Sequence, residues 1–354
     1  MSVAVSIPSI TANKVASSVR IQLSRDDYAL RTGLLTLICF LSILVILPLY
    51  SLLSKSLEDM DGNFVGLQNF HEYFQTPALL ISITNSLSVA FFTALIVLVL
   101  AFIYAYALTR TKMPFRLFFR GVALIPILAP SLLAAISLIY WFGNQGVLKS
   151  WLFGASIYGP IGVIMASCFW VFPHALMILI TALSTADARL YEAAEALRTP
   201  KWRIFWTVTL PGAKYGILST GFVVFTLVIT DFGVPKVIGG NFNVLATDVY
   251  KQVVGQQNFE MGAVVSLVLL LPAVAAFIAD RWVQRKQIAL LSARAVPFQP
   301  KSEPLRDWLL FGFCTIIAFI FLAMLGMAAY ASFVTFWPYN LTLSLNNYDF
   351  DLMD

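Results

Sequence analysis

Seven apolar runs, each about 20 residues long, dominate the chain. A run of this length is what an α-helix needs to cross the hydrocarbon core of a bilayer, since a helix rises about 1.5 Å per residue. A soluble fold of this size could not bury so much apolar surface. The sequence therefore predicts an all-α, polytopic membrane protein, a bundle of about seven transmembrane helices. The predicted spans are 33–54, 83–108, 117–142, 158–183, 215–231, 261–283 and 308–333.

The composition agrees with this prediction. Of the 354 residues, 59% are hydrophobic and 12% are charged, and the mean hydropathy is +0.83. A soluble domain is about 25% charged, so these values exclude a secreted or cytosolic enzyme and a disordered tail. The cysteines Cys39, Cys168 and Cys314 lie inside apolar runs without metal-ligand neighbours, and we interpret them as small hydrophobic residues.

The basic residues indicate how the spans are oriented. Nineteen of the 23 lysines and arginines fall in the N-terminal tail 1–32 and in the second, fourth and sixth connections between spans. Cytoplasmic loops carry the excess of positive charge, so this distribution predicts a cytoplasmic N-terminus and an odd number of spans. Membrane topology thus accounts for the net charge of +5, and we do not expect nucleic acid as a partner. The remaining four basic residues are Lys55, Lys149, Lys236 and Lys251.

The start and the end of the chain resemble each other. This pattern predicts that 305–354 is the first helix and the start of a second copy, joined to the first through a charged, proline-containing cytoplasmic linker at 284–304. On this interpretation the natural second copy extends beyond Asp354. Two helices with similar flanks also match by chance, so that alternative stays open. The matching pairs are Leu30-Arg31 with Leu305-Arg306, before the first and seventh spans, and Gly66-Leu67-Gln68-Asn69-Phe70 with Ser344-Leu345-Asn346-Asn347-Tyr348, after them.

The longest predicted cytoplasmic connection, 187–211, has the features of a docking element. Residues 187–197 favour helix, and Pro200 ends it. The pair Ala193-Ala194 makes one face small, so that another protein surface could approach closely. Leu210-Pro211 then begins the next span.

Larger side chains in the same connection could bind a partner. Leu197 and Trp202 could fill a groove, and Glu192 could pair with a partner's arginine or cap its backbone groups. From composition alone, an amphipathic helix lying at the membrane surface is the alternative.

Glu192-Ala193-Ala194, with Pro211 nineteen positions after Glu192, resembles the EAA loop of ABC importer permeases. The resemblance extends to Trp202, to the segment 66–70 and to Asn85-Ser86-Leu87, and it covers roughly residues 25–354. It implies a six-helix type I permease core at 33–283 in a bacterial inner membrane, with 187–211 as the coupling loop. It also implies three protein partners: a cytoplasmic ABC ATPase dimer, a periplasmic substrate-binding protein, and a second permease half that is fused, homodimeric or heterodimeric.

One position departs from this resemblance. The family usually has glycine six residues after the glutamate, and this chain has Arg198. A glycine would allow a tight bend. Arg198 therefore suggests either a different turn or an added contact with a partner or a lipid phosphate.

The sequence indicates no catalytic, metal or cofactor site. It lacks the G-x-x-x-x-G-K-[ST] phosphate loop, and its two histidines, His71 and His174, are far apart. In line with the resemblance, we expect a transport subunit whose ATP is hydrolysed on a separate chain.

The resemblance narrows the expected solute to ferric iron, thiamine or 2-aminoethylphosphonate, which are the solutes of similar fused permeases. The segments 230–240, 245–248 and 291–297 look most like the 2-aminoethylphosphonate group, so this solute is the prediction and the other two are alternatives. An ion-coupled secondary transporter is less favoured, because such proteins carry inverted repeats and membrane-embedded charges.

Three residues are candidates for the translocation pathway or its gate. Asp231, near the end of the fifth span, could meet an ammonium group or simply cap the adjacent turn. His174 follows Pro173 inside the fourth span and could line the pathway or bond to a neighbouring helix. Lys236 could attract a phosphonate or be an ordinary loop lysine.

Overall fold

The computed structural model describes the backbone of residues 25–290, 296 and 298–349 and, except at 286–290, their side chains. Most of the predicted tail 1–32 and the end of the chain at Asp354 therefore lie outside the described residues. The chain forms two compact units, 1–51 and 52–354. The first unit contains most of helix α1 (Arg25–Ser56), which includes the whole of the first predicted span.

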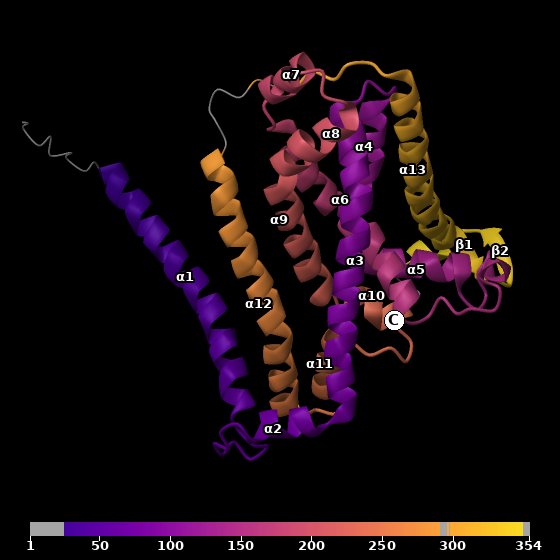
Figure 1. Cartoon of the computed structure of the whole chain (residues 1–354). Coiled ribbons are helices and arrows are strands. Elements are labelled where there is room, and N and C mark those ends of the chain that lie inside the picture. Colours follow the sequence, from indigo (N-terminus) through magenta and orange to yellow (C-terminus); the bar gives the residue numbers. More distant parts are fainter. Residues whose placement is uncertain (1–24, 291–295, 297, 350–354) are drawn as a thin grey trace, which may run out of the picture. The chain divides into compact units, whose positions relative to one another are not determined.

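The second unit consists of helices followed by a small hairpin (Figure 1). The strands of the hairpin are antiparallel, with Val334 opposite Leu343 and Phe336 opposite Asn340. The long helices are α3 (Pro77–Arg110), α6 (Pro160–Ser184), α9 (Leu210–Ile229), α12 (Phe259–Leu290) and α13 (Pro304–Phe333). The short elements are α2 (Gln68–Gln75), α4 (Arg116–Leu124), α5 (Ser131–Phe142), α7 (Ala188–Ala196), α8 (Lys201–Ile204), α10 (Gly233–Ile238), α11 (Leu245–Tyr250), β1 (Val334–Phe336) and β2 (Asn340–Leu343).

Among the described residues, six helices are long and apolar enough to cross a membrane. A bent pair of helices brings the number to seven if it counts as one span. The prediction of an all-α, polytopic membrane protein is thus confirmed. The predicted fifth span starts too late, because α8 continues through a π-helical turn (Phe205–Thr209) into α9. The six spans are Arg25–Ser56, Pro77–Arg110, Pro160–Ser184, Lys201–Ile229, Phe259–Arg285 and Pro304–Phe333.

The predicted third span, 117–142, is wrong as a continuous helix. Helix α4 and the 3-10 turn that follows it (Ile125–Leu128) meet α5 at a bend of 104°. Pro130 explains the break, because it offers no N–H to the helical ladder and restricts the residue before it to extended conformations. Ala129 accordingly has φ −99° and ψ 139°.

The connections rich in basic residues gather at one end of the second unit, the upper end in Figure 1. The C-terminal end of α3, the helices α7 and α8, and the start of α13 lie there, whereas α2 and α11 lie at the opposite end (Figure 1). This arrangement agrees with the alternation of charge that predicts the topology. We call the upper end the basic end.

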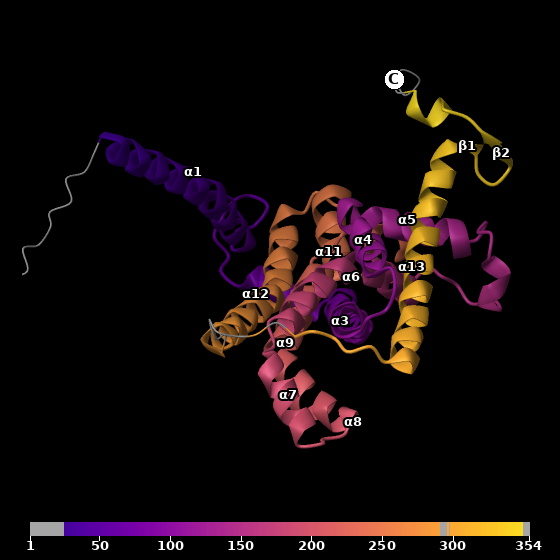
Figure 2. The same cartoon turned by 90° about the horizontal axis from the view of Figure 1, so that it is seen from above.

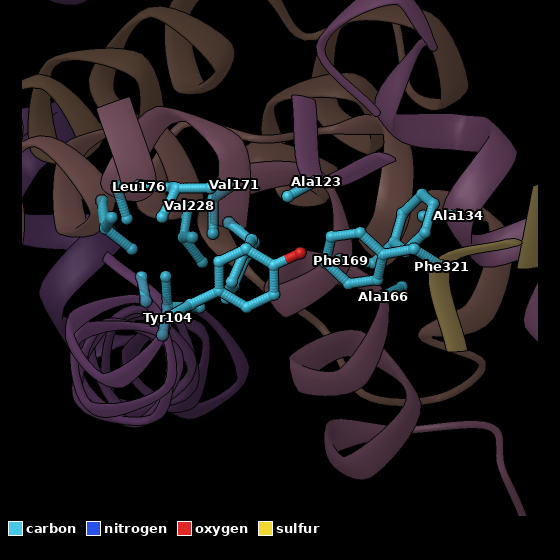
Figure 3. Packing of buried hydrophobic residues seen from close by; sticks show 14 of the residues in the cluster. Tyr104, Ala123, Ala134, Ala166, Phe169, Val171, Leu176, Val228 and Phe321 are labelled. Carbon is cyan, nitrogen blue, oxygen red and sulfur yellow. The ribbon is translucent and has the colours of Figure 1, made fainter. Parts of the chain in front are cut away.

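Buried apolar side chains from α3, α4, α6 and α13 form one core (Figure 3). Phe321 of α13 packs edge-on against Phe169 and Phe172 of α6, with ring centroids 5.0 and 5.1 Å apart. Tyr104 of α3 donates a hydrogen bond to the carbonyl oxygen of Phe119 in α4 at 2.8 Å. Helix α13, which lies alongside α3 and α5 in Figure 2, is therefore packed into the helices that precede it.

The two ends of the predicted repeat share a structural detail. After α1 and after α13, an asparagine side chain donates hydrogen bonds to two backbone carbonyl oxygens, one in the last two residues of the helix and one two residues further along the chain. Those carbonyls have no partner within the helix, so each asparagine satisfies them. The bonds run from Asn69 to Ser56 (3.0 Å) and Glu58 (2.8 Å), and from Asn347 to Ser332 (3.1 Å) and Val334 (2.9 Å).

A buried carboxylate joins α9 to α12. Asp280 of α12 is 6% exposed and accepts hydrogen bonds from Ser219 of α9 and from Gln284, the latter at 2.7 Å. An acid inside an apolar helix is tolerated where polar partners satisfy it. The contact thus fixes the register of the two helices.

Helices α6 and α9 approach each other at small residues. A Cβ built on Gly216 would collide with the Cβ of Ala182, whereas a Cβ on Gly221 of the same helix would meet nothing within 4 Å. Close approach at small residues is how many membrane helices pack, because lipid offers them no hydrophobic driving force. Gly216 therefore sets the distance between α6 and α9.

We expect Gly216→Ala to destabilise the bundle by about 1–3 kcal/mol, because the two helices would have to move apart. Gly221→Ala is the matched control and should be neutral or stabilising by up to about 1 kcal/mol, since alanine favours helix over glycine. Thermal unfolding of the detergent-solubilised protein measures both variants. Equal melting temperatures would contradict the role given to Gly216.

Candidate functional site

Helix α7 begins at a capped residue. The Asp187 carboxylate accepts a hydrogen bond from the backbone N–H of Arg189 at 3.1 Å and forms an ion pair with the Arg189 guanidinium, also at 3.1 Å. The hydrogen bonds from the Arg189 side chain and backbone hold the pKa of the Asp187 carboxyl below its usual range. A charged aspartate also complements the positive end of the helix dipole. The helix, Ala188–Ala196, agrees with the predicted segment 187–197.

The helix ends in the turn that glycine normally permits. Arg198 has φ +52°, in the left-handed region. The N–H of Thr199 donates to the carbonyl of Ala194 at 3.0 Å, and the N–H of Arg198 donates to that of Glu195 at 2.8 Å. These two bonds and the left-handed residue define a Schellman motif. Of the two alternatives for Arg198, a different turn is therefore wrong, and an added contact stays a prediction.

Most of the residues predicted to couple to a partner are accessible and lie in or next to α7 and α8, at the basic end (Figure 1). The Leu197 and Trp202 side chains are 80% and 70% exposed, which is unusual for large apolar groups on a structured segment. Leu210 and Pro211 stand apart from the others, at the start of α9. Near α7 and α8 the exposed members are Glu192, Ala193, Leu197, Arg198 and Trp202, and Ala194 is half-buried; Pro211 is exposed at the start of α9.

The opposite side of α7 is fixed to the bundle. Tyr191 is 7% exposed, and its hydroxyl donates to Oγ1 of Thr209, at the base of α9, at 3.1 Å. The guanidinium of Arg110, the last residue of α3, lies 4.9 Å from the centre of the Tyr191 ring. One aromatic side chain thus ties α7 to two membrane-spanning helices.

Arg110 is the centre of this contact region. It is 3% exposed, and it donates a hydrogen bond to the Leu183 carbonyl oxygen, near the end of α6, at 2.7 Å. The last carbonyls of a helix carry partial negative charge, so they attract the cation. The ring of Phe298 lies 4.4 Å from the guanidinium on another side, and its centroid is 4.6 Å from that of Tyr191. Cation–π contacts of this kind strengthen when they are desolvated.

Phe298 belongs to a segment of the predicted linker that contacts α7. We call residues 296 and 298–303 the strap. Its Val296 carbonyl accepts a hydrogen bond from the N–H of Ala188 at 2.9 Å. Two ion pairs add to the contacts of the strap, one from Lys301 to Glu195 of α7 and one from Glu303 to Lys201 of α8 at 2.6 Å.

The predicted linker 284–304 needs one correction. Helix α12 continues to Leu290, so the first part of that range is helical. The apolar face of α12 ends earlier, and this is why hydropathy places the boundary too soon. Residues 291–295 and 297, which include most of the 291–297 motif, lie outside the described residues.

The three pathway candidates do not form one cluster. Asp231 accepts hydrogen bonds from the Ser131 hydroxyl at 2.9 Å and from the N–H of Val234 at 3.1 Å, so it caps the start of α10. The Lys236 ammonium lies 4.2 Å from the centre of the Tyr250 ring. The Nδ1 atom of His174 is buried without a hydrogen-bond partner among the described residues.

Sequence reasoning missed Arg110, Phe298 and Asp280. By charge alone, Arg110 is one of many cytoplasmic basic residues, although an arginine that directly ends an apolar run is a usable signal. Asp280 was also visible as an acid inside the sixth run. Phe298 gave no signal, because its partners are more than a hundred residues away in the chain.

Asn85 and Ser86, which share in the resemblance to the permeases, connect α3 to the segment that leads into α11. The side-chain amide of Asn85 donates to the Asn243 carbonyl at 2.8 Å, and the Ser86 hydroxyl accepts from the N–H of Leu245 at 2.8 Å. These bonds attach the start of α11 to α3, at the end away from α7 (Figure 1).

Known proteins resemble this chain in sequence, and solved structures resemble it in fold. The family model for the binding-protein-dependent transport system inner membrane component matches residues 98–289. The ferric transport system permease protein FbpB of Actinobacillus pleuropneumoniae is 25% identical over 98% of this chain and 52% of its own length. An FbpB relative from Haemophilus influenzae is 26% identical over 98% of this chain and 56% of its own length. The chain thus spans about half the length of these relatives.

Among solved structures, a bacterial ABC transporter involved in the import of the acidic polysaccharide alginate matches with a TM-score of 0.58. The match covers 75% of this chain and 97% of that one at 15% identity, which shows a shared fold.

The fold is that of a polytopic membrane protein whose basic end carries a helix that is fixed to the bundle on one side and exposed on the other. The family model covers more than half of the sequence. The chain therefore belongs to the binding-protein-dependent inner membrane components, the permeases of ABC transporters. This assignment excludes the secondary-transporter alternative and places the protein in the inner membrane.

We expect Arg198→Gly to stabilise the end of α7 by about 1 kcal/mol, because glycine adopts the left-handed conformation without a Cβ penalty. Arg203→Gly in α8 removes the same charge from a helical position and should cost about 1 kcal/mol instead. Hydrogen exchange of the peptides that cover α7 and α8, followed by mass spectrometry, measures both effects. Changes of the same sign would contradict the role of the turn.

Phe298→Ala removes one of the two rings on Arg110 and should loosen the strap. A desolvated cation–π contact contributes about 1–2 kcal/mol, so exchange of the α7 amides should rise by about tenfold. The control is Phe336→Ala on β1, an exposed phenylalanine that stacks on Tyr339. It should leave α7 unchanged, and unaltered exchange in the Phe298 variant would show that the strap is not held by this contact.

Proposed function

We propose that this chain provides one half of the membrane pathway of an ATP-driven importer, which passes a small solute from a periplasmic binding protein to the cytoplasm. Membership of the permease family supports the transport role. The observation that carries the proposal is the two-sided α7, with Glu192 and Ala193 exposed and Tyr191 fixed to the bundle. A helix held in this way transmits the movement of an outside partner.

The partner at the exposed face is, in this proposal, a cytoplasmic ABC ATPase dimer. The small Ala193 allows close backbone approach, while Leu197 and Trp202 supply apolar area. Glu192 supplies a charge for recognition. ATP drives the movement because it binds the two states of the complex with different affinities. Helix α7 contacts the ATPase differently in the two states.

The contacts of Tyr191 and Arg110 give the route from the ATPase to the membrane. Movement of α7 reaches α9 through Thr209 and reaches α3 through Arg110. The bond from Arg110 to the Leu183 carbonyl adds α6 to the same group. Three spanning helices therefore respond together, as an alternating-access movement requires.

An ATPase dimer has two docking sites, so a second permease half is needed. We propose that it is fused through the strap and begins at α13. The matching hydrogen bonds of Asn69 and Asn347 support this arrangement, as do relatives of about twice the matched length. A dimer of separate half-permeases is the competing arrangement, and it gives no reason for α13.

For the solute, two candidates have a specific basis. Two relatives that match over 98% of the chain are FbpB proteins whose names refer to ferric transport, and this favours ferric iron. The segments 230–240 and 245–248 are the basis for 2-aminoethylphosphonate. Asp231 is held by two hydrogen bonds, whereas Nδ1 of His174 is buried without a hydrogen-bond partner among the described residues, so His174 is the pathway candidate we favour.

Uptake measurements test the proposal directly. Labelled ferric iron and labelled 2-aminoethylphosphonate are supplied to the source cell and to a strain that lacks this gene. Loss of one activity identifies the solute, and rescue by the full-length gene ties the loss to this protein. Normal uptake of both solutes in the deletion strain would contradict both assignments.

We expect Glu192→Ala to lower transport about tenfold, because truncating a residue at the centre of an interface costs on the order of 1–2 kcal/mol. The protein should still insert, since Glu192 is exposed. Uptake and ATP hydrolysis are measured together in proteoliposomes that hold the full-length protein and its ATPase.

Glu195→Ala is the control on the same helix, because Glu195 forms an ion pair with Lys301 of the strap, whereas Glu192, which lines the same cavity, forms no ion pair among the described residues. It should retain most of the transport. Unchanged transport in the Glu192 variant would remove this residue from the coupling surface.

A further inference from the structure

A cavity of about 560 Å³ opens at the basic end between the end of α3, the start of α4 and the end of α6. Three arginines line it, Arg110, Arg116 and Arg120, and no acidic side chain does. Among the residues the structure describes, none of the three forms an ion pair with a carboxylate. The cavity thus concentrates positive charge without a protein counter-charge.

The deepest of these arginines carries the argument. Arg110 is 3% exposed, yet its partners are one carbonyl and two aromatic rings, none of which carries a full negative charge. Its Nε has no hydrogen-bond partner in the described part of the chain. Burying a cation without compensation is costly, so an anion near this group would stabilise the fold.

The other two arginines are arranged to meet that anion. Arg116 and Arg120 lie four residues apart on α4, which places them on the same face of the helix. They stand in its first two turns, where the helix dipole also favours negative charge. Arg116 donates one hydrogen bond to the Thr111 carbonyl at 3.2 Å, and Arg120 is exposed. Guanidinium groups bind phosphate oxygens in a bidentate manner.

We propose that this cavity binds a phosphate group. The rest of the lining favours the head group of an anionic phospholipid as the source. Leu117, Leu108 and Ile180 also line the cavity, and Leu117 is 84% exposed. They provide an apolar surface for an acyl chain at the membrane end where anionic lipids meet basic pockets.

The site is connected to α7, the helix that carries the proposed ATPase contact. Phe298 lines the cavity and also packs on Arg110 and Tyr191. An anion bound beside Arg110 would therefore stabilise the arrangement that fixes α7 and the strap. The phosphate site thus does not depend on the identity of the transported solute.

The test compares two double variants of the full-length protein purified in detergent. Arg116→Gln with Arg120→Gln removes two charges from the cavity. Arg281→Gln with Arg285→Gln removes two exposed charges, also four residues apart, from α12. Native mass spectrometry follows the binding of phosphatidylglycerol, with phosphatidylethanolamine as the neutral reference. In a second arm, inorganic phosphate at constant ionic strength is tested for a shift in melting temperature.

We expect the cavity variant to lose about 30-fold in affinity for phosphatidylglycerol, roughly fivefold per charge, and the α12 variant to lose much less. A melting-temperature shift by inorganic phosphate in the wild type and not in the cavity variant, without lipid selectivity, would support the same site with free phosphate as its source. Equal losses of lipid in both variants, without a phosphate effect specific to the cavity, would overturn the proposal.

Discussion

The buried Arg110 guanidinium is the contact on which the basic end of this permease depends. It lies where three helices end or begin, and its partners come from three separate segments of the chain, α6, α7 and the strap. A carbonyl near the end of α6 and two aromatic rings replace only part of the water that this cation has lost. The same residue therefore fixes α7, holds the strap, and makes the neighbouring cavity positive.

Fixing α7 on one side is what makes its other side useful. A free amphipathic helix at the membrane surface would move with a docked partner, but the spanning helices would not follow it. Tyr191 prevents this, because its hydroxyl and its ring contact different spanning helices. The exposed Leu197 and Trp202 are then apolar groups on a rigid support, which is the condition for a small interface to transmit force.

The sequence predicts the spanning helices, their alternation and the α7 segment well, because hydropathy and charge are local properties. The sequence predicts poorly those features that depend on contacts between residues far apart in the chain. The bend at Pro130 is a partial exception, since the proline was visible, but a count of apolar residues does not register it. At Arg198 the residue type itself argues against the observed turn, because arginine disfavours the left-handed conformation. The two hydrogen bonds that close the end of α7 impose the turn although the residue does not favour it.

The contact of Phe298 with Arg110 has no local signature at all, and it changes how the predicted linker is understood. A linker between two copies has only to span a distance, and composition alone describes 284–304 in that way. Its described part instead pairs with both ends of α7 and leads into α13, whose Phe321 packs inside the core of the preceding helices. In a fused permease, the second half would thus begin inside the first. Its first helix would move with the coupling helix of the other half, because the strap leaves little free chain between them.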